Sequence, residues 1–103
     1  YIEKIENYIE KNIKEPIKID KICKSLGLSK SYIRKIIKKN YGVSFTKFVN
    51  IKKIDYATKI LIEKKLPIYE VAGICGFYDF NYFSRIFKKI KGMSPREFRK
   101  NYL

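Results

Sequence analysis

Histidine and tryptophan are absent from the 103 residues, and cysteine occurs only twice. A metal site needs more thiolate or imidazole ligands than this, and a disulfide framework needs more cysteines. Cys23 and Cys75 instead lie in apolar helical patterns. We therefore expect both to be small, buried core residues of a protein in the reducing cytosol, with no bound metal.

The residues that enzymes use are also missing. The sequence has no histidine base, no glycine-rich phosphate loop and no clustered pair of carboxylates. Its acidic residues are scattered in the manner of helix caps and surface charges, as at Asp20, Asp55, Glu70 and Asp79. No apolar run approaches the roughly 18 residues that cross a membrane. These absences predict a cytoplasmic protein that is not an enzyme, with no catalytic residue and no cofactor.

Acidic residues are few, whereas basic residues are abundant. The chain has 24 Lys and Arg against 10 Asp and Glu, a formal net charge of +14. Two long stretches, from Lys21 to Lys53 and from Phe80 to Arg96, contain no acidic residue. Charge that only keeps a small protein soluble is usually mixed in sign along a helix. Two segregated basic stretches therefore favour two contact surfaces for a polyanion.

The apolar pattern predicts an all-α fold. Apolar residues recur at helical spacing, and Pro16, Pro67 and Pro95 mark helix boundaries. Ser94, followed by Pro95 and Glu97, is a strong start signal for the last helix. The seven predicted helices cover residues 2–12, 19–26, 30–40, 45–64, 68–75, 80–90 and 95–102.

An internal repeat divides the sequence. Fifty residues separate Lys38, Lys39, Gly42, Ser44 and Phe48 from Lys88, Lys89, Gly92, Ser94 and Phe98. Upstream, the offset is forty-nine, and it relates Ile19, Ile22, Cys23 and Gly27 to Ile68, Val71, Ala72 and Gly76. The second copy therefore carries one extra residue between Gly76 and the helix that follows. A repeat whose single gap falls in a turn indicates a duplicated structural unit.

Each copy has the anatomy of a helix-turn-helix. A small residue lets the two helices cross closely, a glycine permits a left-handed turn, an apolar residue plugs the turn, and a polar residue caps the second helix. These residues are Cys23, Gly27, Leu28 and Ser29 in the first copy, and Ala72, Gly76, Phe77 and Asp79 in the second. One such pattern is a weak signal, whereas two that coincide with two basic stretches are strong.

The second helix of each copy presents a polar and basic face. That face carries Lys30, Ser31, Arg34, Lys35 and Lys38 in the first copy, and Asn81, Ser84, Arg85 and Lys88, with Phe80 and Tyr82 near its start, in the second. Arg and Asn match the edges of guanine and adenine in the major groove. Lysines a turn further along are better suited to phosphates.

Three segments are predicted: a first helix-turn-helix subdomain at 1–43, a linker helix at 44–64 and a second subdomain at 65–103. A helix of about twenty residues spans about 30 Å. Successive major grooves on one face of B-DNA lie about 34 Å apart. One chain could therefore read two neighbouring grooves without dimerising.

The sequence resembles the DNA-binding domain of the AraC/XylS transcription regulators, from about Ile5 to Tyr102. The resemblance is carried by Lys53, Ile54, Ala57, Leu61, Ile68, Val71, Ala72, Gly76, Phe77, Tyr82, Phe83, Ser84, Arg85, Phe87, Lys88, Gly92, Met93, Ser94, Pro95, Arg96, Glu97, Phe98 and Arg99. It implies seven helices in two helix-turn-helix units joined by a long helix. Two positions depart from the family pattern: Lys53 stands where Arg is usual, and Phe80 where a polar residue is common.

The resemblance also implies residue roles. The expected base-reading residues are Ser31, Arg34, Lys35, Phe80, Asn81, Tyr82 and Arg85. By their places on the two helices, and apart from the resemblance, the expected phosphate contacts are Lys30, Lys38, Lys39, Ser84, Lys88 and Lys89. Two alternatives stay open for Phe80, which could cap the core or contact a thymine methyl group.

The partners implied are double-stranded DNA and RNA polymerase, because members of this family usually activate transcription. Many members carry a separate effector-binding or dimerisation domain, and nothing here resembles one. The chain begins at Tyr1 and not at Met, which is expected either of a fragment, such as one domain of a longer regulator, or of a protein whose ends are disordered. Non-specific nucleic-acid binding, or binding to anionic membranes, would also suit the charge, but neither requires a duplicated turn.

Overall fold

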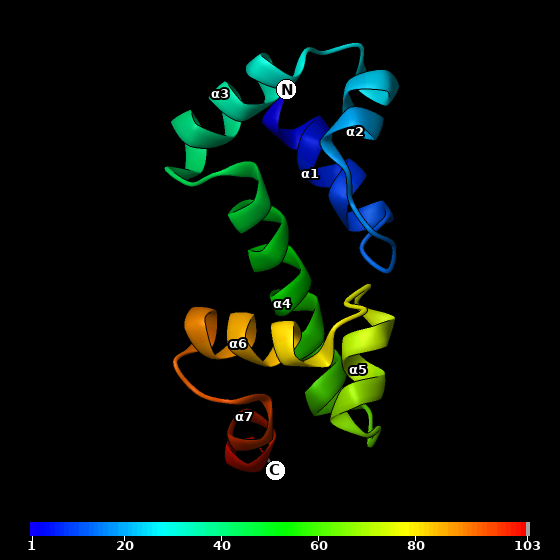
Figure 1. Ribbon diagram of the computed structural model, residues 1–103, viewed down its shortest axis with the longest axis vertical. Coiled ribbons are helices and arrows are strands. Elements are labelled where there is room, and N and C mark those ends of the chain that lie inside the picture. Colours follow the sequence, from blue (N-terminus) through cyan, green and yellow to red (C-terminus); the bar gives the residue numbers. More distant parts are fainter. Residues whose placement is uncertain (103) are drawn as a thin grey trace. The chain divides into compact units, whose positions relative to one another are not determined.

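The computed structural model describes residues 1–102, which form helices and short connections without a strand (Figure 1). The helices are α1 (Ile2–Lys11), α2 (Ile19–Leu26), α3 (Lys30–Tyr41), α4 (Phe45–Glu63), α5 (Ile68–Ile74), α6 (Phe80–Lys91) and α7 (Pro95–Asn101). Every expected helix is present, with ends within one residue of those predicted. The all-α fold is therefore confirmed. No helix within the described residues is long and apolar enough to cross a membrane.

Side chains fix where three of the helices begin. The Ser29 hydroxyl accepts a hydrogen bond from the amide of Tyr32, and the Asp79 carboxylate accepts one from the amide of Tyr82 (3.1 Å each). At α7, Ser94 and Glu97 cap one another's backbone amides in a reciprocal capping box. Each bond satisfies an amide that has no partner inside its helix. The predicted caps at these three positions are confirmed.

The chain forms two compact units, one of residues 1–52 and the other from Lys53 onward, so that α4 contributes to both. In the first unit, α1, α2 and α3 pack on one another, and in the second α6 packs on α5 and α7. The first core is buried Ile5, Ile9, Ile22, Ile33, Ile37, Phe48 and Val49. The second is Ile54, Ala57, Ile60, Leu61, Val71, Ala72, Cys75, Phe77, Phe83, Phe87 and Phe98.

The two cores differ in chemistry. Isoleucine dominates the first, whereas a run of rings dominates the second. Phe83 lies 5.1 Å from Phe77 and 5.8 Å from Phe87 between ring centroids, and Phe87 meets Phe98 edge-on at 5.6 Å. Edge-to-face pairs are favourable beyond the area they bury. This series of rings links Phe77, in the turn before α6, through Phe83 and Phe87 of α6 to Phe98 of α7.

The cysteines differ in burial. Cys75 is fully buried, as predicted, whereas Cys23 is only partly buried at the edge of the first core. Adjacent residues of a helix point about 100° apart. Because Ile22 faces directly into the core, Cys23 lies on the flank of α2. The prediction that Cys23 is a buried core residue was therefore wrong.

A polar cluster joins three helices of the first unit. Glu6 of α1 accepts hydrogen bonds from the hydroxyl of Tyr41 (2.5 Å) and from the ammonium of Lys52 (3.2 Å). The same ammonium lies 5.5 Å from the centroid of the Phe48 ring, within cation–π range. The hydrogen bond from Tyr41, and then the hydrogen bond and charge of Lys52, lower the pKa of Glu6 against the opposing effect of burial. The ionised carboxylate thus ties α1 to α3 and α4.

This cluster predicts a pH-dependent contribution to stability. A carboxyl with a lowered folded-state pKa stabilises above its unfolded pKa, and that contribution is lost as pH falls through the folded-state pKa. We expect Glu6→Gln to lower the free energy of unfolding near neutral pH. The difference from the parent should shrink between about pH 6 and pH 3, a range that includes the ordinary Glu pKa of about 4.3.

Urea unfolding across that pH range measures the effect. Glu10→Gln is the matched control, because Glu10 lies exposed on the same helix. A Glu6→Gln deficit that is the same at every pH would contradict an ionic role for Glu6.

Candidate nucleic-acid interface

The turns of the two copies share a left-handed glycine and one backbone hydrogen bond. Gly27 and Gly76 both have positive φ, at 67° and 80°. The amide of Leu28 donates to the carbonyl of Cys23 (3.2 Å), and the amide of Phe77 donates to that of Ala72 (2.9 Å). A bond over five residues past a left-handed glycine is a Schellman termination. Residues forty-nine apart thus make the same bond, in agreement with the repeat seen in the sequence.

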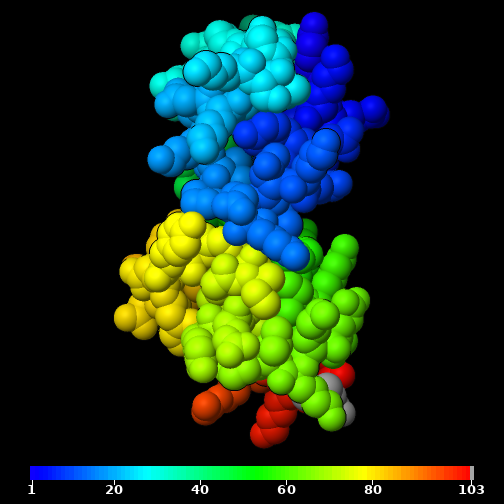
Figure 2. Space-filling view, turned by 90° about the vertical axis from the view of Figure 1, so that its right-hand side faces the viewer, coloured from blue at the N-terminus to red at the C-terminus, as the bar shows by residue number. Residues whose placement is uncertain are grey.

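The extra residue of the second copy is accommodated outside the core. Phe77 is buried as the plug of the turn, and Asp79 caps α6. Tyr78 between them is 83% exposed. Figure 2 shows the turn between α5 and α6, in yellow, at the surface of the second unit. The insertion therefore lengthens the turn without changing the plug or the cap.

Helix α3 separates its buried and open faces cleanly. Ile33 and Ile37 are fully buried, whereas the predicted base-reading residues Ser31, Arg34 and Lys35 are all exposed. These three residues line one groove, together with Lys38 and with residues at the starts of α2 and α4. The structure thus brings the base-reading residues predicted for the first unit together on one open, basic surface.

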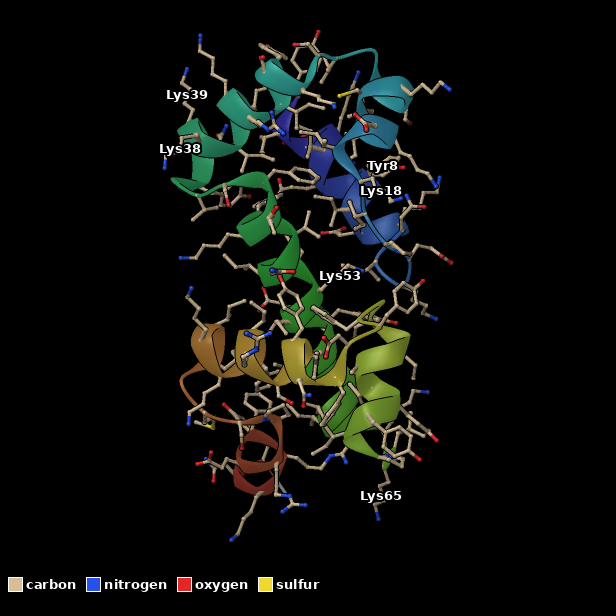
Figure 3. All side chains as sticks on the ribbon, viewed as in Figure 1. Tyr8, Lys18, Lys38, Lys39, Lys53 and Lys65 are labelled. Carbon is tan, nitrogen blue, oxygen red and sulfur yellow. The ribbon has the colours of Figure 1, made fainter. Side chains whose placement is uncertain are left out.

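The predicted phosphate-binding lysines of the first unit lie around this surface. Lys30, at the start of α3, forms an exposed ion pair with Asp20 (2.7 Å). Lys38 donates to the carbonyl of Gly42 (3.3 Å), next to the C-terminal end of the helix. Lys38 and Lys39 extend outward from that end (Figure 3). Exposed pairs of this kind are weak, so these ammonium groups can exchange their partners for phosphates.

Helix α6 repeats this arrangement. Phe83 and Phe87 are buried, and the open face carries exposed Asn81, Arg85, Lys88 and Lys89. Ser84, expected at a phosphate, is partly buried in a groove beside this face. The structure thus places the predicted polar residues of the second unit on one helix, as in the first.

Two aromatic residues at the start of α6 have different surroundings. Tyr82 is partly buried: its ring packs 6.2 Å from Phe77 and lies 5.9 Å beneath the guanidinium of Arg85. Such stacking holds the guanidinium in place. Phe80 is 44% exposed, although its ring lies 6.3 Å from Phe83. Phe80 thus touches the core with one part of its ring and offers the rest to solvent.

Lys53 has a role that the sequence analysis missed. This lysine of α4 is only 4% exposed, and its ammonium donates to the carbonyl of Cys75, directly after α5 (2.8 Å). The position favours a cation because the C-terminal end of a helix carries partial negative charge. The sequence contained a signal for this burial. Lys53 lies four residues from Val49 and four from Ala57, which are both core residues, so that the three share one face of the helix.

The bond from Lys53 holds the turn that precedes α6. The ammonium also lies close enough to the Cys75 thiol to favour its ionisation, but burial is stronger and raises the thiol pKa to about 11. Cys75 is therefore a protonated core residue, and its backbone carbonyl is the group that Lys53 holds. Because Phe77 and Asp79 follow within four residues, this contact positions the start of α6.

We expect Lys53→Met to lower the free energy of unfolding by about 1–3 kcal/mol, because a buried carbonyl would lose this donor. Lys59→Met is the control, since Lys59 is exposed on the same helix and should change stability by less than about 0.5 kcal/mol. Thermal and urea unfolding of the two variants would measure the difference. Equal stabilities would show that the contact with Cys75 contributes nothing.

Comparison with known proteins identifies the architecture. A family described as a helix-turn-helix domain, of the AraC/XylS type, matches residues 22–101. The chain belongs to the AraC/XylS family. A solved AraC-type DNA-binding domain from Chromobacterium violaceum is 25% identical, with a TM-score of 0.88, over 93% of this chain and 86% of that one. The family consists of DNA-binding transcription regulators, so the prediction that the chain is not an enzyme is confirmed.

Longer regulators contain the same domain. The xylose operon regulatory protein of Escherichia coli K12 is 30% identical over 93 residues, which are 90% of this chain and 24% of that protein. The transcriptional activator RhaR of Escherichia coli O1:K1 is 26% identical over 98 residues, 95% of this chain and 35% of RhaR. The AraC-type domain thus spans about a quarter to a third of these relatives.

Proposed function

We propose that this AraC-type domain recognises a specific promoter sequence through α3 and α6, and that it serves a transcription activator. The observation that carries the proposal is the repeated open face: in each unit, one helix buries its apolar side and exposes base-reading residue types beside lysines. The names of two relatives, a xylose operon regulator and a transcriptional activator, support the regulatory part. A non-specific basic nucleic-acid-binding protein is the alternative.

The proposed contacts divide into two kinds. Ser31, Arg34 and Lys35 of α3 and Phe80, Asn81, Tyr82 and Arg85 of α6 read bases, because side chains on these faces can reach a groove floor. Contacts with phosphate come from Lys30, Lys38, Lys39, Ser84, Lys88 and Lys89. The net charge of +14 supports the second set, because each neutralised phosphate releases a condensed counterion.

The two kinds of contact predict different mutant behaviour. Arg85→Ala should weaken binding to a selected operator by about 1–3 kcal/mol and relax the preference at one base position. Lys88→Ala should weaken operator and random duplex by similar factors, because a phosphate contact carries no sequence information.

Duplexes selected from a random pool, and unselected duplexes as competitors, would measure both effects at one salt concentration. If Arg85→Ala weakened both kinds of DNA equally, α6 would not read bases. If the pool yielded no preferred sequence, the non-specific alternative would hold.

We further propose that the two units read successive major grooves without a second chain. Support comes from the repeat and from the connecting segment, since α4 covers every residue from Phe45 to Glu63. A helical connector would set both the spacing and the rotational phase of the two reading helices. The operator should then be non-palindromic, with two blocks whose centres lie about 10 bp apart.

Inserting about five base pairs, half a helical turn, between these blocks would place them on opposite sides of the duplex. Affinity should then fall to that of one unit plus non-specific attraction. An insertion of about ten base pairs is the control for added length, because it restores the phase. Equal affinity for the parent operator and for the operator with the half-turn insertion would show that the connector is not stiff, or that only one unit reads DNA.

We further infer that the whole regulator acts in the cytoplasm on promoter DNA and contacts RNA polymerase while bound. An effector-binding or dimerisation domain would lie outside these 103 residues, in keeping with the greater length of the relatives. The domain itself needs no cofactor for the contacts proposed.

A further inference from the structure

The two units differ at one pair of equivalent positions beside the reading helix. In the first unit, Asp20 of α2 and Lys30 of α3 form an ion pair at 2.7 Å. Offsets of forty-nine and fifty residues place Tyr69 of α5 and Phe80 of α6 at the corresponding positions of the second unit. There, both aromatic rings line one groove. An ion pair in one copy is thus replaced by two aromatic residues in the other.

The grooves beside α3 and α6 also differ in the charge of the residues that line them. The charged residues that line the first are four cations, Lys18, Arg34, Lys35 and Lys38, and one acid, Asp20. The second, which we call the aromatic groove, is lined by Ile68, Tyr69, Phe80, Ser84, Ser94, Pro95 and Arg96. Arg96 is its only charged side chain among the residues described. Corresponding surfaces of the two units thus offer different chemistry to the same kind of polymer.

The aromatic groove keeps apolar surface in water. Tyr69 is 65% exposed and Phe80 is 44% exposed. Burying such surface against an apolar group is favourable at about 25 cal/mol per Å². The groove reaches the reading face of α6, because Phe80 and Ser84 are one helical turn apart on that helix and Asn81 and Arg85 lie beside them.

The charge around the groove favours DNA over a protein as its occupant. The whole segment from Phe80 to Arg96 lacks acidic residues and carries five cations. Arg96 inside the groove and exposed Arg85 beside it attract phosphate. The apolar group that DNA presents in its major groove is the 5-methyl group of thymine.

We propose that the aromatic groove of the second unit binds the 5-methyl group of a thymine, with Phe80 as the residue that contacts it. The first unit, with its ion pair at the equivalent position, has no corresponding preference. The proposal rests on the proposed function, because it adds a base preference to DNA recognition by α6. It also gives the exposed part of the Phe80 ring a specific role.

The test replaces thymine by uracil, which pairs identically but lacks the 5-methyl group. Each thymine of a duplex selected by this chain is changed singly, and affinity is measured at one salt concentration. One substitution should weaken binding by about fourfold, the value expected for the burial of one methyl group. The remaining substitutions should leave affinity unchanged.

Phe80→Ala should weaken binding to the thymine duplex and remove the difference between thymine and uracil at that position. Phe80→Leu should retain part of the difference, and it provides a second variant if the alanine variant unfolds. Lys30→Ala, at the equivalent position of the first unit, is the matched control: it should weaken binding to the thymine and uracil duplexes by the same factor, because a phosphate contact carries no sequence information.

The proposal would be overturned if no single change of thymine to uracil weakened binding, or if the weakening persisted in Phe80→Ala. It would also be overturned if Phe80→Ala bound DNA as tightly as the parent. The last result would assign the aromatic groove to a protein partner instead. These outcomes differ from failure of the proposed function itself, in which no sequence would be selected over random duplex.

Discussion

Both halves of this domain depend on a left-handed glycine at the end of one helix. Gly27 and Gly76 reverse the chain direction, so that the next residue can donate back over five residues to Cys23 or Ala72. That bond places Leu28 or Phe77 as the plug and leaves Ser29 or Asp79 free to cap α3 or α6. The orientation of α3 and α6, each within its unit, follows from this termination.

The cores hold α3 and α6 by different means. Around α3, the packing is aliphatic, and the ionised Glu6 adds a polar tie from α1 to Tyr41 and Lys52. Around α6, linked aromatic rings extend from the turn to α7, and Lys53 holds the end of α5 from within. The same motif therefore tolerates quite different interiors, provided that the turn and the crossing of the helices are preserved.

The duplication conserves backbone positions and lets the surface diverge. Equivalent positions carry an Asp20–Lys30 ion pair in one copy and Tyr69 with Phe80 in the other. A surface pair contributes little to stability, so replacing it has little effect on the fold. It changes what the groove can bind, because exposed aromatic rings favour apolar groups whereas cations favour phosphate. Functional difference between the units can thus arise without any change of architecture.

Local signals in the sequence determined the helices and their ends. Caps at Ser29, Asp79 and Ser94, and the glycines of the turns, act through residues within five positions, so they can be read without a structure. The open faces of α3 and α6 followed from helical periodicity for the same reason. Tertiary structure alone decided the partner of Lys53, since Cys75 lies twenty-two residues away. It also decided the partial exposure of Cys23 and Phe80, and the groove that Phe80 shares with Tyr69. Burial and shared grooves depend on which helices meet, and that is set by packing between distant segments.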